Sequence, residues 1–129
     1  MSEAESKFTF MDQITATVEK AEGFIVLRMP VEAWQALEEL PSEAKKLPRV
    51  LELRLACLGM LKEWQKVVFL GEVIVQLFPE SAQVHFWLAC GLAQSGRNDE
   101  AMEHAKTAAK LNADLRMQML DEEALSGLW

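Results

Sequence analysis

The sequence has no apolar run that approaches the roughly 18–20 residues needed to cross a membrane as a helix. The longest apolar candidate, residues 67–78, is interrupted by Gly71, Glu72 and Gln76. The first residues are acidic and lack the basic-then-apolar order of a signal peptide. These absences argue against a membrane partner and lead us to expect a cytoplasmic protein.

Positive charge is also scarce. Thirteen lysines and arginines stand against twenty aspartates and glutamates, so the formal net charge of the 129 residues is −7. A basic stripe that could follow a phosphate backbone is missing, which argues against nucleic-acid binding. A net acidic surface favours basic or apolar partners and promotes solubility.

Motifs for metal, nucleotide or nucleophilic chemistry are missing as well. The two cysteines, Cys57 and Cys90, form no C-x-x-C pair, and the two histidines, His85 and His104, show no H-E-x-x-H spacing. No phosphate-binding glycine loop and no G-x-S-x-G elbow occurs. We therefore expect no metal, no cofactor and no catalysis, with both thiols reduced and buried.

What the chain does contain is helical periodicity. Apolar residues recur at three- and four-residue spacing, and no strand-like alternation persists over six residues. Most of the prolines and several glycines lie at proposed turns or helix ends, with Asp12, Ser81 and either Asn98 or Asp99 as candidate N-caps. The pattern predicts an all-α fold of six to seven antiparallel helices, over about residues 12–27, 30–40, 48–61, 64–77, 81–94, 98–111 and 115–120.

Three stretches of the chain align on one another at a spacing of 34 residues. Small residues in these columns let helix backbones approach to about 8–10 Å, and a hairpin that cannot bury its own apolar stripe stacks on the next one. The expected organisation is an arm or short leading helix over 1–13, a degenerate repeat over 14–47, repeats over 48–81 and 82–115, and a closing segment over 116–129. The columns are Ala21, Leu55 and Ala89; Phe24, Leu58 and Leu92; Ala33, Val67 and Ala101; Leu37, Gly71 and Ala105; Leu40, Ile74 and Ala108.

The third repeat carries the most complete set of consensus residues, which are Leu88, Ala89, Leu92, Gly96, Ala101, Ala105 and Ala108. With these residues the chain resembles a three-repeat tetratricopeptide protein over residues 14–115, and the last segment is similar to one that closes bacterial arrays of this type. Four positions depart from the family pattern. His85 takes a tryptophan position, Arg54 a leucine position, Gly71 an aromatic position and Lys45 a proline position.

The resemblance implies an antiparallel α–α superhelix in which the first helix of each hairpin lines a concave groove. Such a groove holds an extended peptide or a helix. The alternative is that its apolar residues are simply core. The expected groove residues are Thr15, Val18, Glu22, Ile25, Arg49, Glu52, Ala56, Met60, Gln83, Phe86, Cys90, Ala93 and Gln94.

These features predict a non-catalytic protein–protein interaction module, an adaptor or scaffold. A second hypothesis is a small chaperone for a secreted or translocated client, which an acidic body and an apolar groove would suit. A third is self-association, with the aromatic arm at Phe8 and Phe10 or the terminal Trp129 forming a homodimer, or with the arm filling the groove of its own chain. An enzyme would need a convergent polar cluster, which the sequence does not show.

Overall fold

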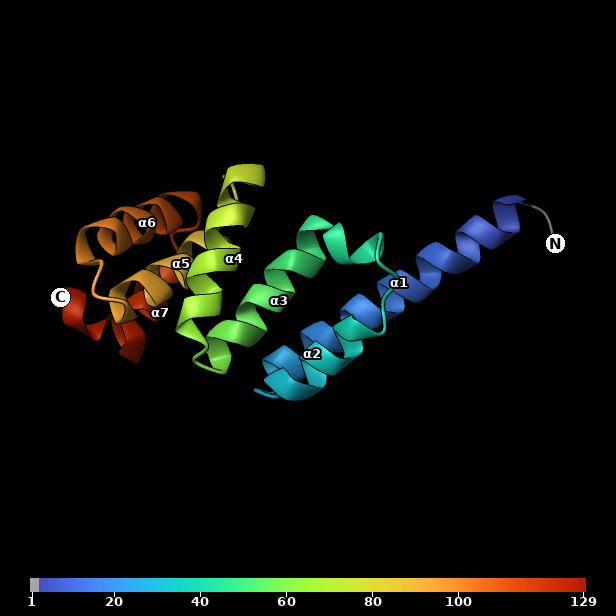
Figure 1. Ribbon diagram of the computed structural model, residues 1–129, viewed down its shortest axis with the longest axis horizontal. Helices are drawn as coiled ribbons and strands as arrows, with labels where there is room; N and C mark the ends of the chain where they lie inside the picture. Colours follow the sequence, from blue (N-terminus) through green and yellow to red (C-terminus); the bar gives the residue numbers. More distant parts are fainter. Residues whose placement is uncertain (1–2) are drawn as a thin grey trace. The chain divides into compact units, whose positions relative to one another are not determined.

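The computed structural model describes the backbone of residues 3–129 and the side chains of residues 9–129, and every regular element in these ranges is helical (Figure 1). The prediction of an all-α fold is therefore confirmed. The elements are α1 (Glu3–Val26), α2 (Pro30–Glu38), the 3-10 segment η1 (Ala44–Lys46), α3 (Pro48–Met60), α4 (Trp64–Leu77), α5 (Ala82–Gln94), α6 (Asn98–Leu111), α7 (Leu115–Asp121) and the 3-10 segment η2 (Glu123–Leu128).

Several boundaries lie where local chemistry places them. Helices α2 and α3 begin at Pro30 and Pro48, since proline has a helical φ and lacks only an N–H that a first turn cannot use. The hydroxyl of Ser81 accepts a hydrogen bond from the Val84 N–H at 3.3 Å, which confirms Ser81 as the N-cap of α5. Gly96 has a φ of 79° in the turn after α5, a conformation that favours glycine.

Two predicted helix starts are wrong. Asp12 does not cap the first helix, because α1 already begins at Glu3, and residues 3–12 contain neither glycine nor proline to interrupt it. Most of the expected arm is therefore helix, while residues 1–2 lie outside the described range. Asn98 is the first residue of α6, and the capping position belongs to Arg97, whose side chain makes no capping hydrogen bond.

The chain forms two compact units, Met1–Cys57 and Leu58–Trp129. The boundary between them falls inside α3. It does not coincide with the repeat boundaries expected after residues 47 and 81.

The first unit is built on the pairing of α1 with α2. Because α1 has 24 residues and α2 only nine, α1 is about 36 Å long against about 14 Å, and it continues past its partner (Figure 1). The first part of α3 completes this core. Its buried residues are Ile14, Ala21, Ala33, Ala36, Leu37, Leu40, Ala44, Val50, Leu53 and Cys57.

The second unit is organised around α5, which is buried without interruption from Val84 to Leu92. Helices α4 and α6 pack on it, and η2 also contacts it. Two glycines permit the close approach of α4 to α5. A Cβ added at Gly91 would lie 2.9 Å from Val67 Cγ1, and one added at Gly71 would lie 3.1 Å from Leu88 Cδ1.

The five columns of the 34-residue period point into the cores. All of their residues are buried except Phe24, which is half-buried and packs against the core of the first unit. These positions are therefore packing positions.

Candidate functional site

The expected groove residues of the first unit are partly covered and partly paired. Val18, Glu22 and Ile25 on α1 are half-buried, as are Glu52 and Ala56 on α3, while Thr15 and Arg49 are exposed. The structure brings two of them together, because Arg49 Nε donates to Glu22 Oε1 at 2.9 Å. This side of the unit is therefore a mixed surface with one exposed ion pair.

In the second unit two of the expected groove residues on α5 are not open to a partner, whereas Gln94 is exposed. Phe86 and Cys90 are fully buried, which corrects the expectation that their side chains line an exposed groove. Part of this burial comes from the closing segment, because η2 packs on α5. The Gln94 amide also donates to the Ala124 carbonyl at 2.8 Å. Gln83 and Ala93 on α5 are half-buried, as is Met60 at the end of α3.

Arg54, one of the departures from the family pattern, has a local explanation in the first unit. Its guanidinium lies 4.5 Å from the centroid of the Trp34 ring, and its Nη2 donates to Glu38 Oε1 at 2.6 Å. Lys45 Nζ lies 3.5 Å from the other oxygen of Glu38. The two unusual cations thus share one carboxylate and tie α2 to the segments that follow it.

An apolar hollow of about 300 Å³ lies in the second unit, where α6, α7 and the end of the chain meet. Four α6 residues at positions i, i+3, i+4 and i+7 form one wall, so a single face of that helix contributes them. Nearly all of the lining surface is apolar. The lining residues are Met102, Ala105, Lys106, Ala109, Arg116, Met119, Leu120 and Trp129.

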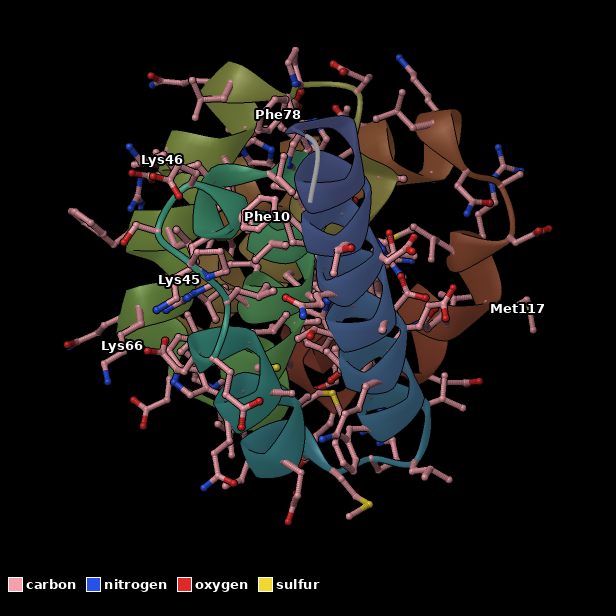
Figure 2. All side chains as sticks on the ribbon, turned by 90° about the vertical axis from the view of Figure 1, so that its right-hand side faces the viewer. Phe10, Lys45, Lys46, Lys66, Phe78 and Met117 are labelled. Carbon is pink, nitrogen blue, oxygen red and sulfur yellow. The ribbon has the colours of Figure 1, made fainter. Side chains whose placement is uncertain are left out.

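Among the described residues that line this hollow, the charged ones, Lys106 and Arg116, are both cations. Lys106 and Arg116 are exposed, and neither makes an ion pair with another described residue. Trp129 remains 53% exposed. Figure 2 shows the side chain of Met117, on α7, pointing away from the helices. The hollow combines an apolar surface with unpaired positive charge on a chain of net charge −7. The sequence prediction assigned Trp129 an interaction role but did not find this hollow.

A second hollow, of about 340 Å³, lies in the first unit between α1 and the end of α2. Phe10 lines it together with Leu40 and Pro41, and Figure 2 shows the Phe10 ring on the side of α1 that faces the connector bearing Lys45 and Lys46. The polar residues Gln13, Thr17 and Glu39 also line it, so it is less apolar than the hollow at α6 and α7.

The two histidines, treated as separate residues in the sequence, form a pair between α5 and α6. Their Nδ1 atoms lie 2.9 Å apart, and His85 Nε2 lies 2.7 Å from the Pro79 carbonyl oxygen. Because a carbonyl only accepts, His85 Nε2 carries the hydrogen and donates it, which leaves His85 Nδ1 to accept from His104 Nδ1–H. The signal that could have indicated this pair is its placement on the two helices that flank the turn at Gly96, eleven residues before it and eight after it.

The environment of the pair lowers the pKa of His104. Partial burial lowers the pKa of His104, and the neighbouring His85 lowers it further, while Glu100, Glu72 and Glu103 oppose the shift. His85 itself is buried. The arrangement is a satisfied polar contact in a helical hairpin, and the described residues include no group of three His, Cys, Asp or Glu side chains that could hold a metal ion.

Both cysteines are free and buried, as predicted. Burial raises the pKa of Cys57 to about 11, and the positive charge of Arg54 only partly opposes this. Burial also raises the pKa of Cys90, and the negative charge of Glu122 acts in the same direction. Thiols held in the protonated form are poor nucleophiles, so neither residue has the environment of a reactive cysteine.

Within residues 3–129, none of the helices is long and apolar enough to span a membrane. Comparisons of the chain with protein-family models, with curated proteins and with solved structures found no match.

Proposed function

We propose that this chain is a non-catalytic protein-interaction module of the tetratricopeptide type, and that it binds a peptide or helix of a protein partner. The observation that carries the proposal is the apolar hollow formed by α6, α7 and Trp129. Its volume of about 300 Å³ is enough for one large apolar side chain, and pockets of this kind anchor helices and extended peptides.

The charges at the hollow define the partner more closely. Lys106 and Arg116 stand at its edge without ion-pair partners among the described residues. A carboxylate beside the anchoring side chain would gain from both cations, whereas a basic residue there would be repelled. The proposed partner is therefore a segment with a large apolar residue flanked by aspartate or glutamate.

The proposed place of action is the cytoplasm, where two free, buried cysteines would stay reduced.

A selection experiment tests the proposed site. A displayed library of 15-residue peptides is selected on the full chain, and the enriched peptides are titrated by fluorescence anisotropy. We expect an acidic residue next to a large apolar one, with dissociation constants on the order of 1–100 µM, as is common for single-anchor peptides.

Two variants identify the site, and one serves as control. Ala109→Phe fills the hollow from α6 and should weaken binding at least tenfold, while Lys106→Gln with Arg116→Gln should weaken it several-fold. Ala113→Phe adds the same side chain at an exposed position in the turn before α7 and should leave binding unchanged. An unchanged peptide affinity in the Ala109→Phe variant, or a selection that enriches no peptide, would contradict the proposal.

A second candidate function is a chaperone for an apolar client. Large apolar side chains are strongly exposed on both units, for example Leu27 in the first and Met117 in the second. A chaperone would keep reduced, unfolded lysozyme soluble at equimolar ratio in a light-scattering assay, and Ala109→Phe would reduce that protection. A chain that binds selected peptides but leaves the aggregation rate unchanged is a recognition module and not a chaperone.

A further inference from the structure

Helix α4 carries a continuous apolar stripe on its solvent side. Phe69, Val73 and Leu77 follow one another at intervals of four residues, and their exposed fractions are 75%, 46% and 60%. Residues four apart lie one above the other on a helix, so the three side chains form a single ridge. Leaving three large apolar side chains of one helix face in water is unfavourable, and such a patch is typical of an interface.

The remainder of α4 has a packing role already. Its opposite face supplies the buried residues Val67, Gly71 and Ile74, and Val68 and Val75 pack against the core of the second unit. Glu72, on the flank of the stripe, accepts a hydrogen bond from Arg97 at 3.1 Å. The stripe is thus the one face of α4 to which the described contacts give no partner.

The charges at the two ends of the stripe are of opposite sign. Lys66 lies three residues before Phe69, the first residue of the stripe, and Glu80 follows three residues after the last helical residue, Leu77. Both are exposed, and neither makes an ion pair with a described residue. Figure 2 shows Lys66 near one end of α4, pointing outward, with Phe78 at the other end.

This distribution is self-complementary in an antiparallel arrangement. If two copies of α4 cross with Val73 at a two-fold axis, the residue at 73 minus n faces the partner's residue at 73 plus n. Phe69 of one copy then packs on the partner's Leu77. Lys66 lies toward the end of the partner's helix, where Glu80 follows in the turn after Leu77, and the symmetry repeats both contacts. The two helix dipoles also run in opposite directions, which is favourable.

We propose that the α4 stripe is a homodimer interface, and that its occupant is the same stripe of a second copy in antiparallel orientation. The interface is distinct from the α6–α7 hollow and leaves it open. A surface of one helix per copy is at the small end of specific interfaces, so we expect a dissociation constant on the order of 10–100 µM.

The oligomeric state of the full chain gives the first test. Sedimentation velocity at concentrations from below to above that range should show the mass rising from 14.6 kDa toward twice that value. Phe69→Glu should keep the chain monomeric throughout, with an unchanged far-ultraviolet circular dichroism spectrum because the side chain does not enter the core. The matched control is Val26→Glu, which places the same charge at a 79% exposed aliphatic residue of α1 and should dimerise as the natural chain does.

Charge exchange tests the orientation. Lys66→Glu alone and Glu80→Lys alone should each weaken the dimer several-fold, since each places like charges opposite one another. The double variant should restore the natural affinity, because the pair is re-formed with its signs reversed. A parallel arrangement would show no such restoration.

Cysteine cross-linking tests the register. In the proposed dimer only the residue at the two-fold axis meets its own copy, so Val73→Cys should be joined by diamide, which takes up the two protons and two electrons that the thiols release. Leu77→Cys is the matched variant, because four residues from the axis the two thiols are separated by about 12 Å along the helices, too far for a disulfide. The native Cys57 and Cys90 are buried and should not compete.

Three results would overturn the proposal. A chain that stays at 14.6 kDa at the highest concentration has no such interface. A dimer that survives Phe69→Glu uses another surface. Cross-linking of Leu77→Cys that matches or exceeds that of Val73→Cys excludes the antiparallel register.

Discussion

We expect the stability of this chain to depend on pH near neutrality through the partly buried His104. The pKa of His104 is lowered in the folded state, first by burial and then by the neighbouring His85. As pH falls through the ordinary histidine value of about 6.5, the unfolded chain therefore takes up the proton more readily than the folded chain. The free energy of unfolding should be highest above about pH 7.5 and should fall as the solution is acidified toward pH 5.5.

Urea unfolding at several pH values between 5.5 and 7.5 checks this dependence. The variant His104→Gln removes the titrating ring, while its amide can still donate to His85 Nδ1. We expect the variant to show a smaller change in unfolding free energy over this interval than the natural chain. Equal slopes for the two proteins would show that His104 does not cause the pH dependence.

Two glycines in helices should respond in opposite directions to substitution by alanine. A Cβ at Gly59 would lie 2.1 Å from Trp87 Cε3, so the buried indole would have to move, and overpacking of this kind costs about 1–3 kcal/mol. Gly23 lies inside α1 with nothing within 4 Å of an added Cβ, so alanine there should stabilise the chain by about 0.5–1 kcal/mol. Thermal unfolding of the two variants measures both effects. If both alanine variants are less stable than the natural chain, the space around the added methyl group does not decide the effect, and the prediction for Gly23 is wrong.

Helix α5 has a side-chain N-cap, Ser81, immediately before its first residue. Replacing Ser81 by alanine removes the acceptor for the Val84 N–H and should lower the free energy of unfolding by about 1 kcal/mol. Replacing it by aspartate keeps a capping oxygen and should preserve most of the stability. Equilibrium urea unfolding compares the three proteins, and equal losses for alanine and aspartate would mean that the cap itself is not the important contact.

The sequence predicts the elements well because its signals at this scale are local. Prolines at the starts of α2 and α3, the cap at Ser81 and the glycine turn at Gly96 each act within a few residues. The predicted start of α1 at Asp12 is wrong, because Asp12 can cap a helix only where the chain before it is not already helical. Helix propensity over residues 3–11 overrides that signal.

The candidate site was harder to predict, because it depends on which segments meet. The family resemblance placed Phe86 and Cys90 in an open groove, but η2, from a distant part of the sequence, packs on α5. The hollow at α6 and α7 likewise requires Trp129 to lie beside Ala109, twenty residues earlier in the chain. Periodicity gives the face that a residue occupies on its helix, and it does not give the segment that covers that face.

At the scale of the whole molecule, the two compact units each contain one buried cysteine, Cys57 in the first and Cys90 in the second. Each thiol therefore reports the opening of its own unit, since a reagent reaches it only when the surrounding helices separate. The first unit depends on the pairing of α1 with the nine-residue α2, whereas α5 in the second unit is covered by α4, α6 and η2. We expect Cys57 to become accessible at a lower free energy than Cys90.

Alkylation with iodoacetamide in dilute urea, followed by tryptic digestion and mass spectrometry, separates the two sites. Cleavage after Arg54 and Lys62 isolates Cys57, while cleavage after Lys66 and Arg97 isolates Cys90. Both thiols should react far more slowly than in the fully unfolded chain, which is the reference for each peptide, and Cys57 should react first because fewer apolar contacts must be broken to expose it. Equal protection would mean that the units open in one cooperative step through the continuous helix α3. Faster reaction at Cys90 would mean that the coverage of α5 contributes less to stability than its burial implies.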